Sequence, residues 1–480
     1  MSAKRETSLP EKDGKKPFLN SWNESLLPFI ASATIVLPVW LGVLLPLSLV
    51  SLGLKAAMHK KKYQTPINLD NVKVLKRASD TTGRDFDLVL FGATGFTGRL
   101  CALYLTKTYG LKSFRWAIAG RRQDALNAIK EELKLIDPSL KDLPIIIADS
   151  NDHASIDRMT SSAKCVISTS GPFARYGKYL VQSCAVNGTH YCDITGETDF
   201  VREMIDCFDD LARESGAFII SSCGNDCVPW DLMLHECSKH MQKQGLDDKI
   251  VQMDMFVEGN FEPSGGTLET AMGIFNDRIQ LKTRLGYDPM LKDPRTGQKR
   301  DTKMIQNHPK FIAYASKIGK WMCPFFMTPV MASCMKRSNT VNQYTDKFIY
   351  REGMVFGNFG AAFTFIMSLI AFGTALTIPP LQWLLRKYVL PAPGQGPSDA
   401  TMDKGYLLLT AYATTNSKRQ CKGEMYFPTD AGYRDTARML VESGLVLALQ
   451  SKDISRAGGV YSPASCQGSL LTDRLLRTGT

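Results

Sequence analysis

The stretch DLVLFGATGFTGRL, residues 87–100, decides the fold. An apolar run leads into three glycines at positions 92, 95 and 98, and RLCALYLTKTY follows as a predicted helix. In a strand–turn–helix unit, glycine lets the backbone approach a pyrophosphate, and the helix N-terminus supplies N–H groups and a positive dipole end. The stretch therefore predicts a phosphate cradle rather than a bare turn.

Apolar, β-rich runs alternate with amphipathic helical runs on both sides of this unit. Strands are expected at 85–92, 115–120, 144–149, 165–169, 189–194 and 217–222, with helices at 123–136 and 198–215 among those that separate them. Nearly continuous apolar strands that alternate with helices are typical of a parallel sheet buried on both faces. The fold class predicted is α/β, a Rossmann-type doubly wound parallel sheet.

The end of the second strand indicates which dinucleotide binds. Arg121 and Arg122 stand where NAD enzymes usually place an acidic residue for the ribose 2′-hydroxyl. Arginine pairs instead with a 2′-phosphate through charge-assisted hydrogen bonds, so NADP(H) is favoured over NAD(H). Asp149 is expected near the adenine, and 168–177 near the nicotinamide. The predicted cofactor-binding residues are Gly92, Ala93, Thr94, Gly95, Phe96, Thr97, Gly98, Arg121, Arg122, Asp149, Ser170, Gly171 and Pro172.

Hydride transfer also needs a proton source beside the nicotinamide. The candidates for catalysis lie near the strand ends and are Tyr176, Asp193 and Glu197, together with Lys178 and Asp226. Two of them have structural alternatives, since Glu197 can act as a first-turn carboxylate of the next helix and Asp193 can bind backbone groups of its turn. None of the 16 tyrosines has lysine four residues on, which disfavours the short-chain dehydrogenase mechanism.

Composition restricts the partners. The chain has 480 residues and a formal charge of +11, and much of the basic excess lies beside apolar sequence, which favours a membrane over nucleic acid. The 12 cysteines lack metal-ligand spacing, so we expect no metal site and a reducing compartment.

Two uncharged stretches indicate membrane contact. Residues 26–54 would form a helix of about 43 Å, longer than a hydrocarbon core of about 30 Å. Basic residues flank both ends, so three readings remain: a single span, a hairpin broken at Pro38 or an interfacial insertion, and a buried helix. Residues 353–385 suit either a membrane-lying element or a helix pair buried at a domain or dimer interface.

Later residues add three local expectations. SGGT at 264–267 is either a second backbone-amide nest or a plain strand–helix turn. Residues 405–415 and 420–427 are predicted as paired strands, and 430–449 as a helix with its apolar face inward.

The combination of motifs resembles the saccharopine dehydrogenase-like oxidoreductases, which include the trans-acting enoyl reductases. The matching stretches, in order over 86–480, are FGATGFTGRL, IAGRR, STSGPFARYG, YCDITGE, GNDCVPWDL, SGGTLETA, PAPGQGPSDA and GGVYSPAS. The resemblance implies a Rossmann domain with an inserted mixed α/β domain, NAD(P)-dependent redox activity, and association with membranes or lipid droplets. Asn225 departs from the family pattern, which usually has an aromatic residue there.

The domains expected are a polar arm at 1–25, a membrane segment at 26–57, a basic linker at 58–84, a Rossmann domain at 85–225, an inserted substrate or dimerisation domain at 226–400 and a returning segment at 401–480. The function expected is a membrane-associated NADP(H)-dependent reductase of an apolar acyl or lipid substrate. Its catalytic domain would face the cytosol from a lipid droplet, the endoplasmic reticulum or the outer mitochondrial membrane. A cofactor-binding sensor without turnover and a structural coat at a lipid surface are the alternatives.

Overall fold

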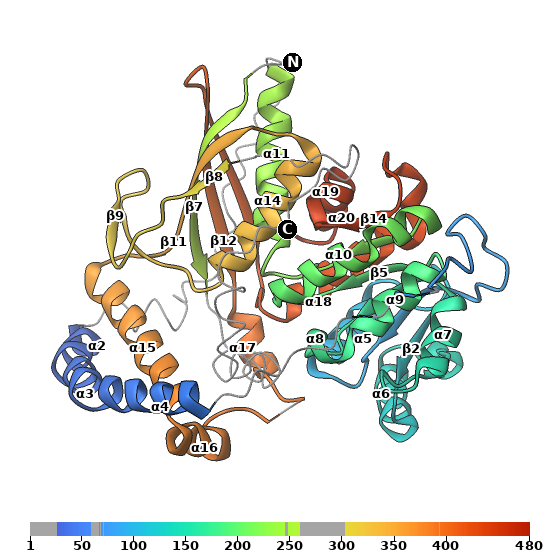
Figure 1. The fold of residues 1–480 in the computed structure, drawn as a ribbon, viewed down its shortest axis with the longest axis horizontal. Coiled ribbons are helices and arrows are strands. Elements are labelled where there is room, and N and C mark those ends of the chain that lie inside the picture. The colour runs from blue at the N-terminus through green and yellow to red at the C-terminus, as the bar shows by residue number, and fades with distance from the viewer. Residues whose placement is uncertain are drawn as a thin grey trace.

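The computed structural model describes residues 26–58, 67, 69–70, 72–244, 248–259, 303–392 and 394–480. The arm at 1–25, part of the basic linker and the SGGT stretch at 264–267 lie outside these residues. Figure 1 shows a helix-covered parallel sheet, a second sheet beside it, and a group of apolar helices at the corner farthest from the parallel sheet.

The first sheet is parallel throughout, which confirms the predicted Rossmann-type fold. Its strands run in the order β14-β6-β5-β4-β1-β2-β3. They are β1 (Phe86–Phe91), β2 (Trp116–Gly120), β3 (Ile145–Ile147), β4 (Ala163–Ser168), β5 (His190–Asp193), β6 (Phe218–Ile220) and β14 (Gly459–Tyr461). The last strand comes from the C-terminal end of the chain and closes one edge.

Each strand is apolar on both sides because helices cover both faces. Leu88 and Leu90 of β1 point to the face covered by α5 (Phe96–Thr108), α6 (Gln123–Ile136) and α18 (Arg434–Gln450). Val89 and Phe91 point to the other face, under α7 (His153–Ser161), α9 (Lys178–Val186) and α10 (Thr198–Ser215). This two-sided burial is why the strands read as continuous apolar runs.

The second sheet is mixed and has the order β13-β12-β7-β11-β10-β9, with β8 paired to β11. Its strands are β7 (Ile250–Gly259), β8 (Lys303–Gln306), β9 (Ala313–Ala315), β10 (Lys320–Cys323), β11 (Lys347–Phe356), β12 (Leu407–Thr415) and β13 (Gln420–Phe427). Helix α11 (Val228–Gln244) packs on it and on α14 (Thr328–Asn342). The predicted pairing of β12 with β13 is confirmed, but both strands belong to this sheet. The return to the first sheet therefore begins after Phe427 and not at residue 401.

Helix α18 is more deeply buried than the predicted single inward face. It packs on α5, β4 and β5, and on α20 (Ser469–Arg477). Glu442 in its centre is fully buried and accepts hydrogen bonds from the hydroxyls of Tyr104 at 2.6 Å and Tyr109 at 2.7 Å. Its second oxygen pairs with Arg474 Nε at 2.6 Å. This buried network joins the returning segment to the first sheet's helices.

The first apolar stretch forms one continuous helix, here called the N-terminal helix. It comprises α2 (Leu26–Ala31), a π-helical turn at Ser32–Val36, α3 (Leu37–Val39), a second π-helical turn at Trp40–Leu44, and α4 (Leu45–Met58). Of the three readings of this stretch, the hairpin broken at Pro38 is contradicted by the continuous helix. A proline ring clashes with the carbonyl four residues back, and for Pro38 and Pro46 that carbonyl lies inside a π-helical turn, which widens the helix there.

The second apolar stretch begins at the end of β11. It continues as α15 (Phe359–Thr377) and α16 (Pro379–Tyr388). By length and composition, Pro28–Leu52 and α15 are both able to cross a membrane, with 6% and 28% of their apolar windows buried. Along α15 six residues are buried, eleven are half-buried and only Phe359 and Ser368 are exposed, so neighbouring elements cover part of this helix.

Replacing Glu442 by Gln should lower the free energy of unfolding by about 3 kcal/mol, because it leaves the Arg474 guanidinium without its buried counter-charge. Chemical denaturation measured by tryptophan fluorescence gives the value. The control is Glu131→Gln, which removes an exposed pair with Lys134 and should change stability by less than about 0.5 kcal/mol. Equal effects of the two changes would contradict the network's role.

Candidate active site

The glycine turn after β1 is packed so closely that side chains cannot enter it. Gly92 has φ +87°, and a Cβ there would lie 2.8 Å from Thr169 Oγ1. A Cβ on Gly98 would overlap the carbonyl oxygen of Gly92 and lie 2.8 Å from the same hydroxyl. The first turn of α5, the end of β1 and the loop after β4 therefore meet as backbone against backbone.

The N-terminus of α5 opens onto this turn. Gly95 caps the helix without a side-chain hydrogen bond, and its carbonyl accepts the Arg99 N–H at 2.8 Å. The N–H groups of Phe96, Thr97 and Gly98 consequently have no partner within the helix. A pyrophosphate fits this arrangement, since the N–H groups and the dipole both favour an anion and no Cβ fills the space.

The two arginines lie at the same edge of the sheet as the cradle. Strand β2 pairs with β1 in the register Phe91↔Ala119, which places Arg121 and Arg122 beside Gly92. Both side chains are exposed, and neither forms an ion pair with any residue that the structure describes. They suit a phosphate that arrives with the ligand.

Asp149 lies at the end of the edge strand β3. Its Oδ1 accepts the N–H of Asn151 at 2.9 Å, so this carboxylate supports its own turn.

The predicted nicotinamide loop, Ser170 to Pro172, follows β4 and carries a cis peptide bond between Gly171 and Pro172. The hydroxyl of Thr169 donates to the Gly92 carbonyl at 3.0 Å, which joins this loop to the cradle.

Two of the predicted catalytic carboxylates bind backbone groups. Glu197 is buried, and its oxygens accept the N–H groups of Phe173 at 2.8 Å and Ala174 at 3.0 Å. It therefore holds the nicotinamide loop rather than the first turn of its own helix. Asp193 is fully buried and accepts from the N–H groups of Thr195 and Ser222 at 3.0 and 2.9 Å. Burial raises its pKa to about 6.

Tyr191 and Ser221 donate hydrogen bonds from their hydroxyls to the other oxygen of Asp193, at 3.0 and 3.2 Å.

The predicted catalytic residue Tyr176 is half-buried in a four-residue helix, and the Arg175 guanidinium lies 5.1 Å from its ring centre. Lys178 pairs with Glu203 at 2.6 Å. Tyr176 and Lys178 therefore both contact neighbouring side chains of the protein.

Asp226 differs from the other acids at this edge. It lies in the turn between β6 and α11, and its Oδ2 is 3.8 Å from the position that a Cβ on Gly196 would take. Burial raises its pKa to about 6. Within the described ranges it makes no hydrogen bond or ion pair. Among the described residues it is therefore an acid at the carboxyl edge of the first sheet that keeps both oxygens available.

Sequence reasoning missed a buried acid in the second domain. Glu352 on β11 is fully buried, burial raises its pKa to about 7, and nearby Thr328, Tyr350 and Trp230 offset part of that effect. Among the described residues neither of its oxygens has a hydrogen-bond partner of normal geometry. The available signal was its inward position on a strand, between Tyr350 and Met354, where charged residues are rare.

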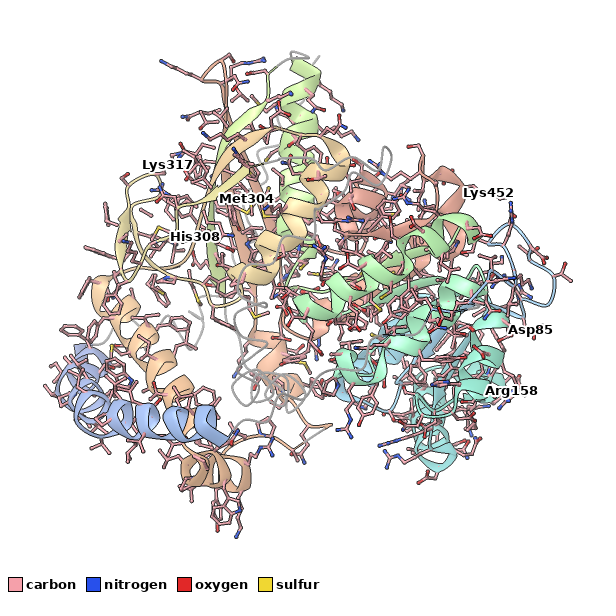
Figure 2. All side chains as sticks on the ribbon, in the orientation of Figure 1. Asp85, Arg158, Met304, His308, Lys317 and Lys452 are labelled. Carbon is pink, nitrogen blue, oxygen red and sulfur yellow. The ribbon has the colours of Figure 1, made fainter. Side chains whose placement is uncertain are left out.

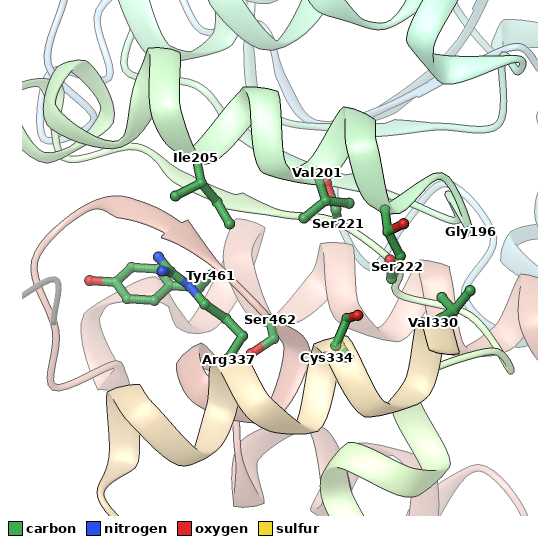
Figure 3. A pocket seen from close by; sticks show the side chains of 12 residues that line it. Gly196, Val201, Ile205, Ser221, Ser222, Val330, Cys334, Arg337, Tyr461 and Ser462 are labelled. Carbon is green, nitrogen blue, oxygen red and sulfur yellow. The ribbon is translucent and has the colours of Figure 1, made fainter. Parts of the chain in front are cut away.

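A small pocket lies between α10 and α14, next to the end of β6 (Figure 3). Its free volume is about 30 Å³, enough for water but not for an acyl chain. It is lined by Gly196, Thr198, Val201, Ile205, Ser221, Ser222, Val330, Ser333, Cys334, Arg337, Tyr461 and Ser462. One of these lining residues, Gly196, is close to the Asp226 carboxyl group.

Replacing Gly98 by Ala should abolish dinucleotide binding, since the added methyl group displaces the Gly92 carbonyl and opens the cradle. Gly95→Ala is the matched control, because its Cβ would lie 3.3 Å from the same oxygen and needs only a small shift. Calorimetric titration with NADPH gives both affinities. Tight binding by Gly98→Ala would contradict the assignment of the cradle.

Replacing Arg121 by Ala should weaken NADPH binding about tenfold to a hundredfold and leave NADH binding unchanged, because only the 2′-phosphate loses a charged partner. The control is Arg115→Ala, which removes a guanidinium at the opposite end of β2. A parallel loss of both dinucleotides in Arg121→Ala would show that this residue does not select the phosphate.

Comparison with known proteins identifies the family. Residues 88–220 match the saccharopine dehydrogenase NADP binding domain. A Mycobacterium tuberculosis protein provisionally named a trans-acting enoyl reductase is 34% identical over 421 residues, which cover 83% of this chain and 97% of that protein. The trans-acting enoyl reductase of Mycobacterium ulcerans is 32% identical over 419 residues, or 82% of this chain and 97% of its own.

Among solved structures, the apo saccharopine dehydrogenase (L-Glu forming) of Saccharomyces cerevisiae aligns with 81% of this chain and 96% of its own at 11% identity and a TM-score of 0.46. The family match agrees with the predicted cofactor, and the curated relatives agree with the predicted class of reaction. The chain is therefore an NADP(H)-binding oxidoreductase and belongs to the saccharopine dehydrogenase-like family that includes the trans-acting enoyl reductases.

Proposed function

We propose that this chain reduces the carbon–carbon double bond of an α,β-unsaturated acyl substrate with NADPH, at the surface of a membrane. The observation that carries the proposal is Asp226, an acid with a raised pKa and unoccupied oxygens at the carboxyl edge of the NADP(H)-binding sheet. The relatives named enoyl reductases, which match over more than four-fifths of the chain, supply the class of bond.

Reduction of such a bond adds one hydride and one proton, and two C–H bonds replace the π bond. NADPH, when bound, supplies the hydride. The chain contributes the cradle at Gly92–Gly98, the loop held by Glu197, and a proton from the Asp226 carboxyl group to the carbon next to the acyl carbonyl. Solvent returns the proton to Asp226 after each turnover. Glu197 and Asp193 act as positioning residues because their oxygens already bind the chain.

The membrane part of the proposal is supported by two helices that are long and apolar enough to cross a membrane, the largely uncovered Pro28–Leu52 and the partly covered α15. A medium- or long-chain acyl group dissolves in lipid, so attachment brings the active site to its substrate. We assign the cytosolic face of a lipid droplet, the endoplasmic reticulum or the outer mitochondrial membrane, where NADPH is available to an exposed Rossmann domain.

The direct test is to incubate the protein with NADPH and α,β-unsaturated acyl thioesters of increasing chain length. We expect NADPH to be consumed and each product to gain two hydrogens in its mass. NADPH binding without consumption, for every acyl length, would favour the alternative of a cofactor-binding sensor.

Replacing Asp226 by Asn should reduce kcat by about a hundredfold or more while NADPH binding is retained, since proton transfer contributes about 10²–10⁴-fold. In the wild type the donor is protonated below its pKa of about 6. The rate should therefore fall about tenfold for each pH unit above that value, and this decline with rising pH should be absent in Asp226→Asn.

The same variant separates a catalytic from a structural role. Burial disfavours the ionised form of Asp226, so the wild type loses stability between the ordinary pKa of 3.8 and about 6 and stays destabilised above it. Asp226→Asn should consequently be more stable than the wild type at pH 8, by about 3 kcal/mol, because each pKa unit corresponds to about 1.4 kcal/mol. Asp206→Asn, at an exposed surface pair, is the control and should change neither rate nor pH profile. A destabilised Asp226→Asn with unaltered pH dependence would reject the assignment.

A further inference from the structure

The N-terminal helix and α15 pack side by side along their lengths. At the start of α15, the Phe29 ring lies 6.4 Å from Phe359 and 5.6 Å from Phe363, both edge to face. Further along, the Trp40 indole N–H donates to Thr374 Oγ1 at 3.0 Å. The two helices therefore run in the same direction and lie at the same depth relative to the rest of the protein.

Polar groups of this pair bind one another instead of water. At the end of α15, Thr377 Oγ1 donates to Ser48 Oγ at 2.8 Å, and Ser51 Oγ donates to the Thr377 carbonyl at 2.8 Å. Such internal pairing is what a hydrocarbon environment requires, because no solvent is present to satisfy the groups.

The outer surface of the pair is apolar and uncovered. Leu49 and Val50 are 62% and 61% exposed, and side chains of the N-terminal helix project away from the body (Figure 2). The other exposed apolar residues of the pair are Ile30, Ile35, Val39, Leu41, Val43, Leu47 and Phe359. A continuous exposed patch of this kind indicates a contact surface.

Helix α16 has the composition of a membrane–water interface. Trp383 and Tyr388 are 58% and 66% exposed, and Lys387 Nζ lies 5.0 Å from the centre of each ring. Arg386 adds a second cation in the last turn. Aromatic rings with adjacent cations are enriched at the level of lipid headgroups.

The connections at both ends exclude a crossing by α15. Its N-cap, Asn358, comes two residues after β11 ends, and after α16 the chain returns to the first domain, where Gly396 packs against the Phe96 ring of α5. Residues 388 to 396 span at most about 28 Å when fully extended. A hydrocarbon core is about 30 Å thick and admits no extended chain with unpaired backbone groups. Both ends of α15–α16 therefore lie on one side of the membrane.

Both ends of the N-terminal helix lie on the side of the body as well, since its start packs through Phe29 against Phe359, three residues after β11 ends. The helix ends at Met58, and Ile67 already packs against the core of the first domain. The nine intervening steps reach at most about 32 Å and include the lysines at 60–62. A chain of this charge cannot recross the hydrocarbon to reach the domain.

We infer that the N-terminal helix, α15 and α16 insert together into one leaflet of a phospholipid membrane, and that the chain does not span it. This inference rests on the membrane attachment proposed above. The helix pair occupies the acyl region, while Trp383, Tyr388 and the cations of α16 lie among anionic headgroups. Because the inference needs only one leaflet, it also predicts binding to a lipid monolayer, which cannot hold a membrane span.

The first test determines on which side of the membrane the N-terminus and the catalytic body lie. The full chain, with an epitope tag before Met1, is incubated with sealed vesicles of phosphatidylcholine and phosphatidylserine, isolated by flotation, and digested with protease from outside. Insertion into one leaflet predicts that the tag and the catalytic body are both digested. A protected tag would overturn the inference in favour of a span, whereas failure of the wild type to float would reject membrane attachment itself.

The second test measures whether the exposed apolar side chains of the N-terminal helix are needed for binding to lipid. The double variant Leu49→Asp with Val50→Asp should partition at least about tenfold more weakly into these vesicles and into monolayer-coated oil droplets. Leu135→Asp is the matched control, because Leu135 is 88% exposed on α6, outside the helix group. Unaltered NADPH binding confirms that each variant is folded. Wild-type flotation of the double variant, or no wild-type binding to the monolayer, would overturn the inference.

Discussion

The carboxyl edge of the NADP(H)-binding sheet, here called the cofactor edge, depends on the backbone contact between Gly98 and the Gly92 carbonyl. This contact brings the first turn of α5 against the end of β1, while the Thr169 hydroxyl fastens the loop after β4 to the same carbonyl. Any side chain at Gly98 would separate these three segments, and with them the N–H groups that face the phosphates. The position of the loop after β4 follows from one close approach that only glycine permits.

A second constraint explains why several acids at this edge differ in role. Glu197 and Asp193 are buried, and each has its oxygens occupied by N–H or O–H donors, so they hold the loops in place. Asp226 is close to Gly196 but receives no donor from the described part of the chain, and burial leaves its pKa near 6. In the proposed mechanism, hydrogen-bond partners and not residue type therefore decide which acid positions the loops and which one transfers the proton.

The first sheet was predictable because its signals are local. Continuous apolar runs predicted β1 to β6, and the arginine pair after β2 indicated the 2′-phosphate. What the sequence could not provide are contacts between distant segments. The Glu197 carboxylate binds N–H groups 24 and 23 residues earlier in the chain, and β12 joins a sheet whose β7 partner lies more than 140 residues before it. The hairpin at Pro38 failed for a different reason, since π-helical turns absorbed the proline without a break.

The short return from α16 to Phe96 fixes how far the cofactor edge stands from the apolar helices. The chain there is too short to let the catalytic body drift away from a leaflet in which the helices are seated. A substrate dissolved in that leaflet would reach the protein by lateral diffusion within the leaflet. Velocity then follows the mole fraction of substrate in the lipid and not its amount per volume of water, so the composition of the surface becomes the quantity that governs the rate.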